Sequence, residues 1–153
     1  MKNSLQIEPQ VYQELVDFYG QLFDMPPLSA KIYAYLAFDF ERKGLCFDDL
    51  VETFCASKSS ISASINFLLN AELIKSLNKI EERKRYFLIN ESFINIRFEE
   101  IVTRMKREIK ILDQLSEFRR TQVNNTEYEK RYSLYKSLLE KNIANIQETL
   151  DKL

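Results

Sequence analysis

The side chains best suited to chemistry in this chain are hydroxyls and cations that gather in its middle third. The run ASKSSISASINFLLN carries five serines, at positions 57, 59, 60, 62 and 64, and continues into an apolar pattern with helical spacing. Serine is a mediocre helix former because its hydroxyl competes for backbone groups, but it is a favoured cap at a helix start. Exposed hydroxyls can also bond phosphates or base edges. The pattern therefore indicates a helix that uses its first turns for hydrogen bonding.

The charge distribution separates the same region from its surroundings. The net charge of the whole chain is −1, which argues against a general polyanion binder. Residues 1–56 carry four Lys or Arg against nine Asp or Glu, whereas residues 57–90 carry six against three. Residues 91–153 are nearly balanced, with twelve against eleven. The positive balance thus coincides with the serines.

Several classes of site are excluded by composition. The chain has no histidine, which removes the commonest general base, and its two cysteines are too few for a zinc or disulfide framework. The acidic pairs Asp48-Asp49 and Glu99-Glu100 are adjacent in sequence, so each pair diverges around its helix. We therefore expect no enzyme, no metal and no cofactor. With no membrane-length apolar run and no signal peptide, a cytoplasmic protein is expected.

Hydrophobic spacing predicts the elements that position these side chains. Helices are expected over residues 9–23, 29–40, 48–54 and 58–70, the last capped by Ser57. Strands are expected over 73–78 and 83–89 with a hairpin tip over 79–82, and a short extended piece over 45–47. Ser29 is the expected cap of the second helix and Gly44 its end. Apolar faces are expected to point inward in the first two helices: Val11, Leu15, Phe18, Leu22 and Phe23, then Ile32, Tyr35, Leu36 and Phe40.

The last third is expected to be two long helices. The break falls at Asn124-Asn125, and Thr126 with Glu129 forms a capping-box pattern. The apolar stripes comprise Ile94, Phe98, Ile101, Met105, Ile109, Leu112 and Leu115, followed by Tyr128, Tyr132, Tyr135, Leu139, Ile143, Ile146 and Leu150. A hairpin alone does not bury both stripes, so we expect a homodimer. The alternative is a monomeric three-layer helical domain.

The order of elements predicts a mainly α fold with a small β-wing: a winged helix-turn-helix followed by long dimerisation helices. Residues 1–25 would form an N-terminal packing or dimerisation helix, 26–90 the DNA-binding domain, and 91–153 the dimerisation region. On a helical wheel Ile61, Ile65, Leu68 and Leu69 face the core, and the opposite side is small and polar. The candidate DNA-binding residues are Ser57, Lys58, Ser59, Ser60, Ser62, Ala63, Asn66, Lys79, Arg83, Lys84 and Arg85.

Residues 26–89 resemble the MarR superfamily of winged-helix regulators, and within it the GbsR-like branch. The resemblance rests on LSAKIYAYL (28–36), DDLVETFCASKSSISASINFLLNAELI (48–74) and RKRYF (83–87). Cys55 and Glu72 stand where the family usually has glycine in a left-handed conformation, and Ala63 where relatives often have arginine. The wing also lacks its glycine, so Asn78 is expected to supply the turn.

The resemblance implies a homodimeric transcriptional regulator, acting as a repressor on a pseudo-palindromic operator and responding to a small molecule. The branch implies a quaternary ammonium effector, for which an aromatic cage is suited; the candidates are Tyr12, Tyr19, Tyr33 and Tyr35, with core packing as the alternative. Cys46 and Cys55 flank the first helix of the motif, either as buried inert thiols or as a redox switch. The rival function is a winged helix that binds a protein partner and no DNA.

Overall fold

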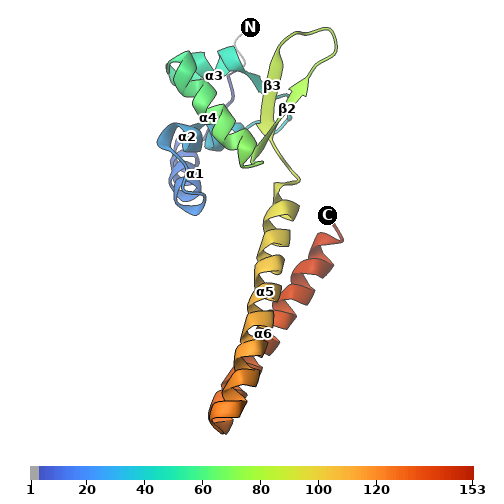
Figure 1. Cartoon of the computed structure of the whole chain (residues 1–153). Helices are drawn as coiled ribbons and strands as arrows, with labels where there is room; N and C mark the ends of the chain where they lie inside the picture. Colours follow the sequence, from blue (N-terminus) through green and yellow to red (C-terminus); the bar gives the residue numbers. More distant parts are fainter. Residues whose placement is uncertain (1–3) are drawn as a thin grey trace. The chain divides into compact units, whose positions relative to one another are not determined.

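The computed structural model describes residues 4–153, and the chain divides into two compact units, Met1–Glu91 and Ser92–Leu153 (Figure 1). The first unit contains α1 (Pro9–Leu22), α2 (Pro27–Leu36), β1 (Leu45–Cys46), α3 (Phe47–Phe54), α4 (Lys58–Asn70), β2 (Ile74–Asn78) and β3 (Arg85–Ile89). The second contains α5 (Phe93–Gln122) and α6 (Thr126–Leu150). The predicted winged helix-turn-helix with long C-terminal helices is confirmed.

The core of the first unit lies between α2, α3, α4 and the sheet. Its best buried side chains are Ile32, Leu45, Leu50, Ile61, Leu68 and Leu73. The three strands are antiparallel in the order β1-β3-β2, with Leu45 opposite Phe87 and Ile74 opposite Ile89. Gly44 precedes β1 with a φ of +78°, and a Cβ there would lie 2.9 Å from Cβ of Tyr86. Glycine therefore allows the chain to enter the sheet beside β3.

The second helix differs from its prediction at both ends. It begins at Pro27 after Pro26, whose φ of −56° suits a helix entry, and Ser29 is buried inside the helix rather than capping it. The helix ends at Leu36, well before Gly44, so Phe40 lies in the following loop and is 80% exposed. The expectations for Ser29 and Phe40 were wrong because the prolines set the helix start earlier and the helix stops after ten residues.

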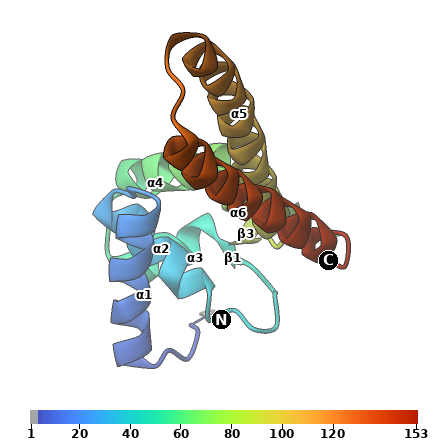
Figure 2. The same cartoon turned by 90° about the horizontal axis from the view of Figure 1, so that it is seen from below.

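Helix α1 packs along α2 (Figure 2) but contains no buried residue. Tyr19 and Phe23 lie against Tyr33 of α2, with ring centroids 4.7 and 6.3 Å from its ring. Of the expected inward face, Leu15 is half-buried, whereas Val11 is 46%, Phe18 57% and Leu22 39% exposed in the single chain. The predicted face is therefore only partly covered.

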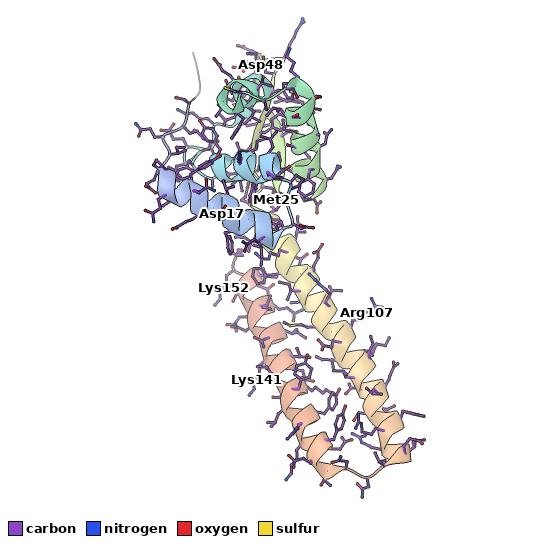
Figure 3. All side chains as sticks on the ribbon, turned by 90° about the vertical axis from the view of Figure 1, so that its left-hand side faces the viewer. Asp17, Met25, Asp48, Arg107, Lys141 and Lys152 are labelled. Atoms are coloured by element: carbon purple, nitrogen blue, oxygen red, sulfur yellow. The ribbon has the colours of Figure 1, made fainter. Side chains whose placement is uncertain are left out.

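In the second unit, α5 and α6 pack side by side as an antiparallel hairpin, with side chains filling the space between them (Figure 3). Val102, Ser116, Leu139 and Ile143 are buried in this unit. Large apolar side chains remain open to solvent along both helices: Ile94, Ile111, Leu115, Phe118, Leu134 and Leu138.

The start of α6 corrects the predicted capping box. Asn125 is the N-cap, and its Oδ1 accepts from the backbone N–H of Tyr128 at 3.1 Å. Thr126 is instead the first helical residue, and Glu129 bonds to Ser116 and Arg120 of α5. Asparagine is at least as good a cap as threonine, and a bond to α5 uses the glutamate for tertiary structure.

Among residues 4–153, no helix combines the length and apolar character needed to cross a bilayer.

Candidate nucleic-acid interface

Helix α4 begins at a hydroxyl cluster in which Ser57 is the cap. Its Oγ accepts from the backbone N–H of Ser60 at 3.2 Å, as predicted. The same hydroxyl donates to Oγ of Ser60 at 2.8 Å and lies 3.2 Å from Oγ of Ser59. Because the single Ser57 proton goes to Ser60, the bond between Ser57 and Ser59 uses the Ser59 proton, and the Ser60 proton remains available to an external acceptor.

The rest of α4 divides into two faces as the helical wheel predicts. Ile61, Ile65 and Leu68 are buried, and Leu69 is half-buried. The opposite side, which we call the α4 face, is exposed and consists of Lys58, Ser59, Ser60, Ser62, Ala63 and Asn66. Ser64 is buried and belongs to the core side. The α4 face thus presents short side chains, which allow another surface to approach the helix backbone closely.

A residue with a left-handed backbone conformation lies just before α4 and another just after it. Cys55 has φ 47° in the turn from α3, and Glu72 has φ 59° after the helix, the two positions at which the family pattern has glycine. A non-glycine residue in this region costs roughly 1 kcal/mol. The backbone of the motif is therefore kept even though the residue that would favour it is absent.

The β2–β3 hairpin closes with a turn at Lys79–Glu82, where the Glu82 N–H donates to the Lys79 carbonyl at 3.2 Å. Glu81 is the left-handed residue of this turn, with φ 74°. Asn78 is instead the last residue of β2, opposite Arg85. The expectation that Asn78 supplies the turn was wrong, because β2 runs through Asn78 and the turn begins one residue later, at Lys79.

Tyr86 of β3 contacts two of the charged side chains of the hairpin turn, those of Glu82 and Lys79. The Tyr86 hydroxyl donates to a carboxylate oxygen of Glu82, and Nζ of Lys79 lies 3.8 Å from the Tyr86 ring centroid. The bond to Glu82, together with burial, raises the pKa of Tyr86 to about 12. Lys79 is therefore engaged by an aromatic face, so it is a weaker candidate for a phosphate contact than its sequence suggests.

The other three hairpin cations are exposed along its return strand. Arg83, Lys84 and Arg85 precede the buried part of β3, and the Arg85 guanidinium lies 5.3 Å from the Phe87 ring centroid. Together with Cys46, Phe47 and Asp48 they line a cavity of about 290 Å³ beside the start of α3. The Asp48 carboxyl is the only acidic group in this lining.

The aromatic candidates for an effector site do not form one group. Tyr19 and Tyr33 are in edge contact within the α1–α2 packing. Tyr35 is buried, lies 5.5 Å from the Phe54 ring, and its hydroxyl accepts from the Leu5 N–H at 2.9 Å. The Tyr12 hydroxyl donates to the Lys31 carbonyl. Tyr19 and Tyr33 thus meet each other ring to ring, and Tyr35 packs on α3.

The two cysteines differ in environment. Cys46 is buried at the start of α3, where burial raises the pKa of its thiol. Cys55 is exposed in the turn before α4. The expectation of two buried thiols was therefore wrong for Cys55, because the left-handed turn points its side chain outward. Among residues 4–153, no group of three or more His, Cys, Asp or Glu is arranged to hold a metal ion.

Comparison with known proteins shows with which kind of structure this chain shares its fold. No protein-family model and no curated protein sequence matches the chain. A crystal structure of a transcriptional regulator is similar over 94% of this chain and 95% of its own, with a TM-score of 0.56 and 14% identity. At this identity, the likeness shows a shared fold.

Weaker similarity extends to MepR, a transcription regulator of the Staphylococcus aureus multidrug efflux pump MepA. That match covers 87% of this chain and 90% of MepR, with a TM-score of 0.44 and 16% identity. A MepR–DNA complex matches 87% of this chain and 88% of its own, with a TM-score of 0.43 and 17% identity.

Sequence reasoning missed the residues that tune the hairpin. Tyr86 was noted only as part of the family pattern, yet it positions both Lys79 and Glu82. Asp48 was considered only as a paired acid, although it lies beside the hairpin cations. Neither role is visible in local spacing, because each depends on strands that are paired across the sheet.

Proposed function

We propose that this protein is a DNA-binding transcriptional regulator of the MarR superfamily, GbsR-like branch, and that it acts as a homodimeric repressor. The observation that carries the proposal is the α4 face: an exposed row of small polar side chains on the second helix of a helix-turn-helix. This helix enters the DNA major groove in such proteins, with its N-terminal residues at the base edges. Residues 26–90 would bind DNA and residues 91–153 would join the two copies.

The chemistry of the interface divides between the helix and the hairpin. Ser60 and Ser62 offer hydroxyl protons to phosphates or base edges, Ser59 offers an acceptor oxygen, and Asn66 suits the two-bond recognition of adenine. Arg83, Lys84 and Arg85 contribute positive charge for the backbone or the minor groove. Ala63 offers no hydrogen bond for guanine. Affinity would therefore depend strongly on phosphate contacts and on salt.

The dimer is supported by apolar surface that the single chain leaves open. Val11, Phe18 and Leu22 on α1 are exposed, as are Leu115 and Leu134 in the second unit. Side chains of this size gain by burial at about 25 cal/mol per Å² of apolar surface, and long helices with exposed stripes gain it by association. Two copies would place two α4 faces on the half-sites of a pseudo-palindrome.

The deciding experiment is a fluorescence-anisotropy titration with DNA from upstream of the protein's own coding sequence at two salt concentrations. The variant is Ser60→Glu, which places a negative charge on the α4 face. Ser133→Glu is the matched control, because Ser133 is exposed on α6 in the second unit. We expect wild type and Ser133→Glu to bind alike and more weakly in high salt, and Ser60→Glu to lose binding.

Equal binding by all three proteins would exclude α4 as the contact surface. Absence of binding in all three would favour the rival function, a winged helix that docks a protein partner. Analytical ultracentrifugation of the wild type tests the homodimer separately, and a monomer at micromolar concentration would contradict it.

The effector is proposed to be a small quaternary ammonium compound held by the aromatic residues of α1 and α2. Tyr19 and Tyr33 are the pair that the fold brings together. Isothermal titration with choline and with glycine betaine tests the proposal. No heat with either compound would remove both as effectors.

A further inference from the structure

The outermost side chain of the hairpin is apolar. Ile80 is 93% exposed, the most open of the large hydrophobic side chains among the described residues. It is the second residue of the Lys79–Glu82 turn, so its side chain leaves the tip rather than either face of the sheet. A single exposed isoleucine is ordinary on a protein surface. Its position at the end of a projecting cationic hairpin gives it a different meaning.

The neighbours of Ile80 are drawn back from the tip. Lys79 lies over the Tyr86 ring, and Glu82 accepts the hydroxyl proton of the same tyrosine. Both contacts direct charged groups toward the base of the hairpin. Glu81, the one acid at the tip without this tie, is held in a left-handed conformation at the next position of the turn. The isoleucine therefore precedes Lys79 and Glu82 when the hairpin approaches a surface, and Glu81 is the exposed charge beside it at the tip.

Behind the tip, the hairpin carries the charge needed to hold DNA. Residues 79–85 contain four cations and two acids. Arg83, Lys84 and Arg85 are exposed just behind the turn. Such a layout, an apolar point followed by cations, matches minor-groove proteins that place an apolar wedge between base pairs while basic side chains bind the phosphates on both sides.

We propose that Ile80 inserts as a wedge between two base pairs from the minor groove and kinks the DNA. The inference rests on the proposed function, because it needs the α4 face in the neighbouring major groove. A wedge partly unstacks a base step, and pyrimidine–purine steps such as TA unstack most readily. The hairpin would thereby select flexible steps at a position where it forms no hydrogen bond to a base. The hairpin would therefore add specificity through the ease with which a DNA sequence deforms, and not through contacts to base edges.

The test measures bending and affinity separately. A circular-permutation gel assay with the upstream DNA fragment gives the bend angle, and anisotropy gives the affinity. The variants are Ile80→Ala, which removes the wedge, and Ile80→Met, which keeps an apolar side chain of similar reach. Phe40→Ala is the control, since Phe40 is an 80% exposed apolar side chain of the loop after α2, outside both the α4 face and the expected dimer stripes. Circular dichroism shows that each variant is folded.

We expect the wild type, Ile80→Met and Phe40→Ala to bend the DNA alike. Ile80→Ala should bind about tenfold more weakly and leave the fragment nearly straight, because truncation removes most of the buried apolar contact. Wild-type binding with a bend that Ile80→Ala retains would overturn the wedge while leaving the proposed function intact. A wild-type protein that binds no DNA would overturn both.

Discussion

The hydroxyl of Tyr132 donates to Oδ1 of Asp113 at 2.7 Å and so joins α6 to α5. The same carboxylate accepts two bonds from Nζ of Lys136, at 2.9 and 3.0 Å. One acid on α5 thus receives a tyrosine and a lysine from successive turns of α6. This group fixes how far the two helices of the second unit slide along each other, because a shift by one turn would break all three bonds.

The group makes the second unit sensitive to pH at both extremes. The bonds from Tyr132 and Lys136 lower the pKa of Asp113, so the carboxylate adds stability above its unfolded value of about 3.9 that is lost as the pH falls through the lowered value. Burial and the bond to Asp113 raise the pKa of Tyr132 to about 12. Stability from the neutral hydroxyl is therefore complete below about pH 10 and is lost toward pH 12.

We expect Asp113→Asn to remove most of the loss of stability that the second unit shows as the pH falls. Thermal melts followed by circular dichroism between pH 2 and 7 measure it. Glu117→Gln is a suitable control, because Glu117 is an exposed acid on the same helix. If the melting temperature of Asp113→Asn fell with decreasing pH as steeply as that of the wild type, Asp113 would not be the source of the acid dependence.

The left-handed residue after α4 predicts a stabilising substitution. Glu72 has φ 59°, and glycine adopts this conformation without the Cβ strain that glutamate bears. Glu72→Gly should therefore raise the free energy of unfolding by about 0.5–1 kcal/mol, less the entropy that glycine adds to the unfolded chain. Urea denaturation measures the change. Glu72→Ala keeps the strain, so a gain of the same size in that variant would point to the loss of the charge instead.

The cap of α4 should matter for stability more than its neighbours do. Ser57→Ala removes the acceptor for the Ser60 N–H, which costs about 1 kcal/mol at a helix N-cap. Ser62→Ala should change stability little, because the Ser62 side chain is exposed on the α4 face. The two variants are compared in urea melts. Equal losses would mean that α4 does not depend on its cap.

Asp48 should weaken the DNA contacts proposed for the hairpin. Its carboxyl lines the same cavity as Arg83 and Lys84 and would face a bound phosphate with like charge. We expect Asp48→Asn to strengthen DNA binding about two- to fivefold at low salt, with a smaller gain at high salt. Asp17→Asn changes the charge equally at a separate place on the first unit (Figure 3). An equal gain in both variants would indicate a general charge effect.

Local sequence pattern predicted the helix-turn-helix correctly, but it did not identify the residue that supplies the turn of the hairpin. The cap at Ser57 and the two faces of α4 follow from helical periodicity, and the left-handed residues at 55 and 72 follow from the family resemblance. The hairpin tip at residues 79–82 was predicted correctly, but Glu81 rather than Asn78 is its left-handed residue, because Asn78 pairs with Arg85 in the sheet.

Tertiary structure also decided between competing candidates in the helices. Asn125 and Thr126 are both good caps, and the adjacent Asn125 takes the role while Glu129 bonds to α5. On α1, periodicity identified an apolar face, but it does not show how much of that face a single chain covers. The extent of burial depends on what packs against α1, and α2 covers only part of it.

The hydrogen bonds among the α4 hydroxyls affect how the proposed DNA specificity can change during evolution. Ser57 holds the helix start together through bonds to Ser59 and Ser60, whereas Ser62 and Asn66 are exposed on the α4 face outside this cluster. Mutations at the exposed positions are thus nearly free of a folding penalty, while position 57 tolerates only other capping residues. In the proposed DNA-binding role, new target sequences would be accessible by single substitutions along one helix face, without a compensating change in the core.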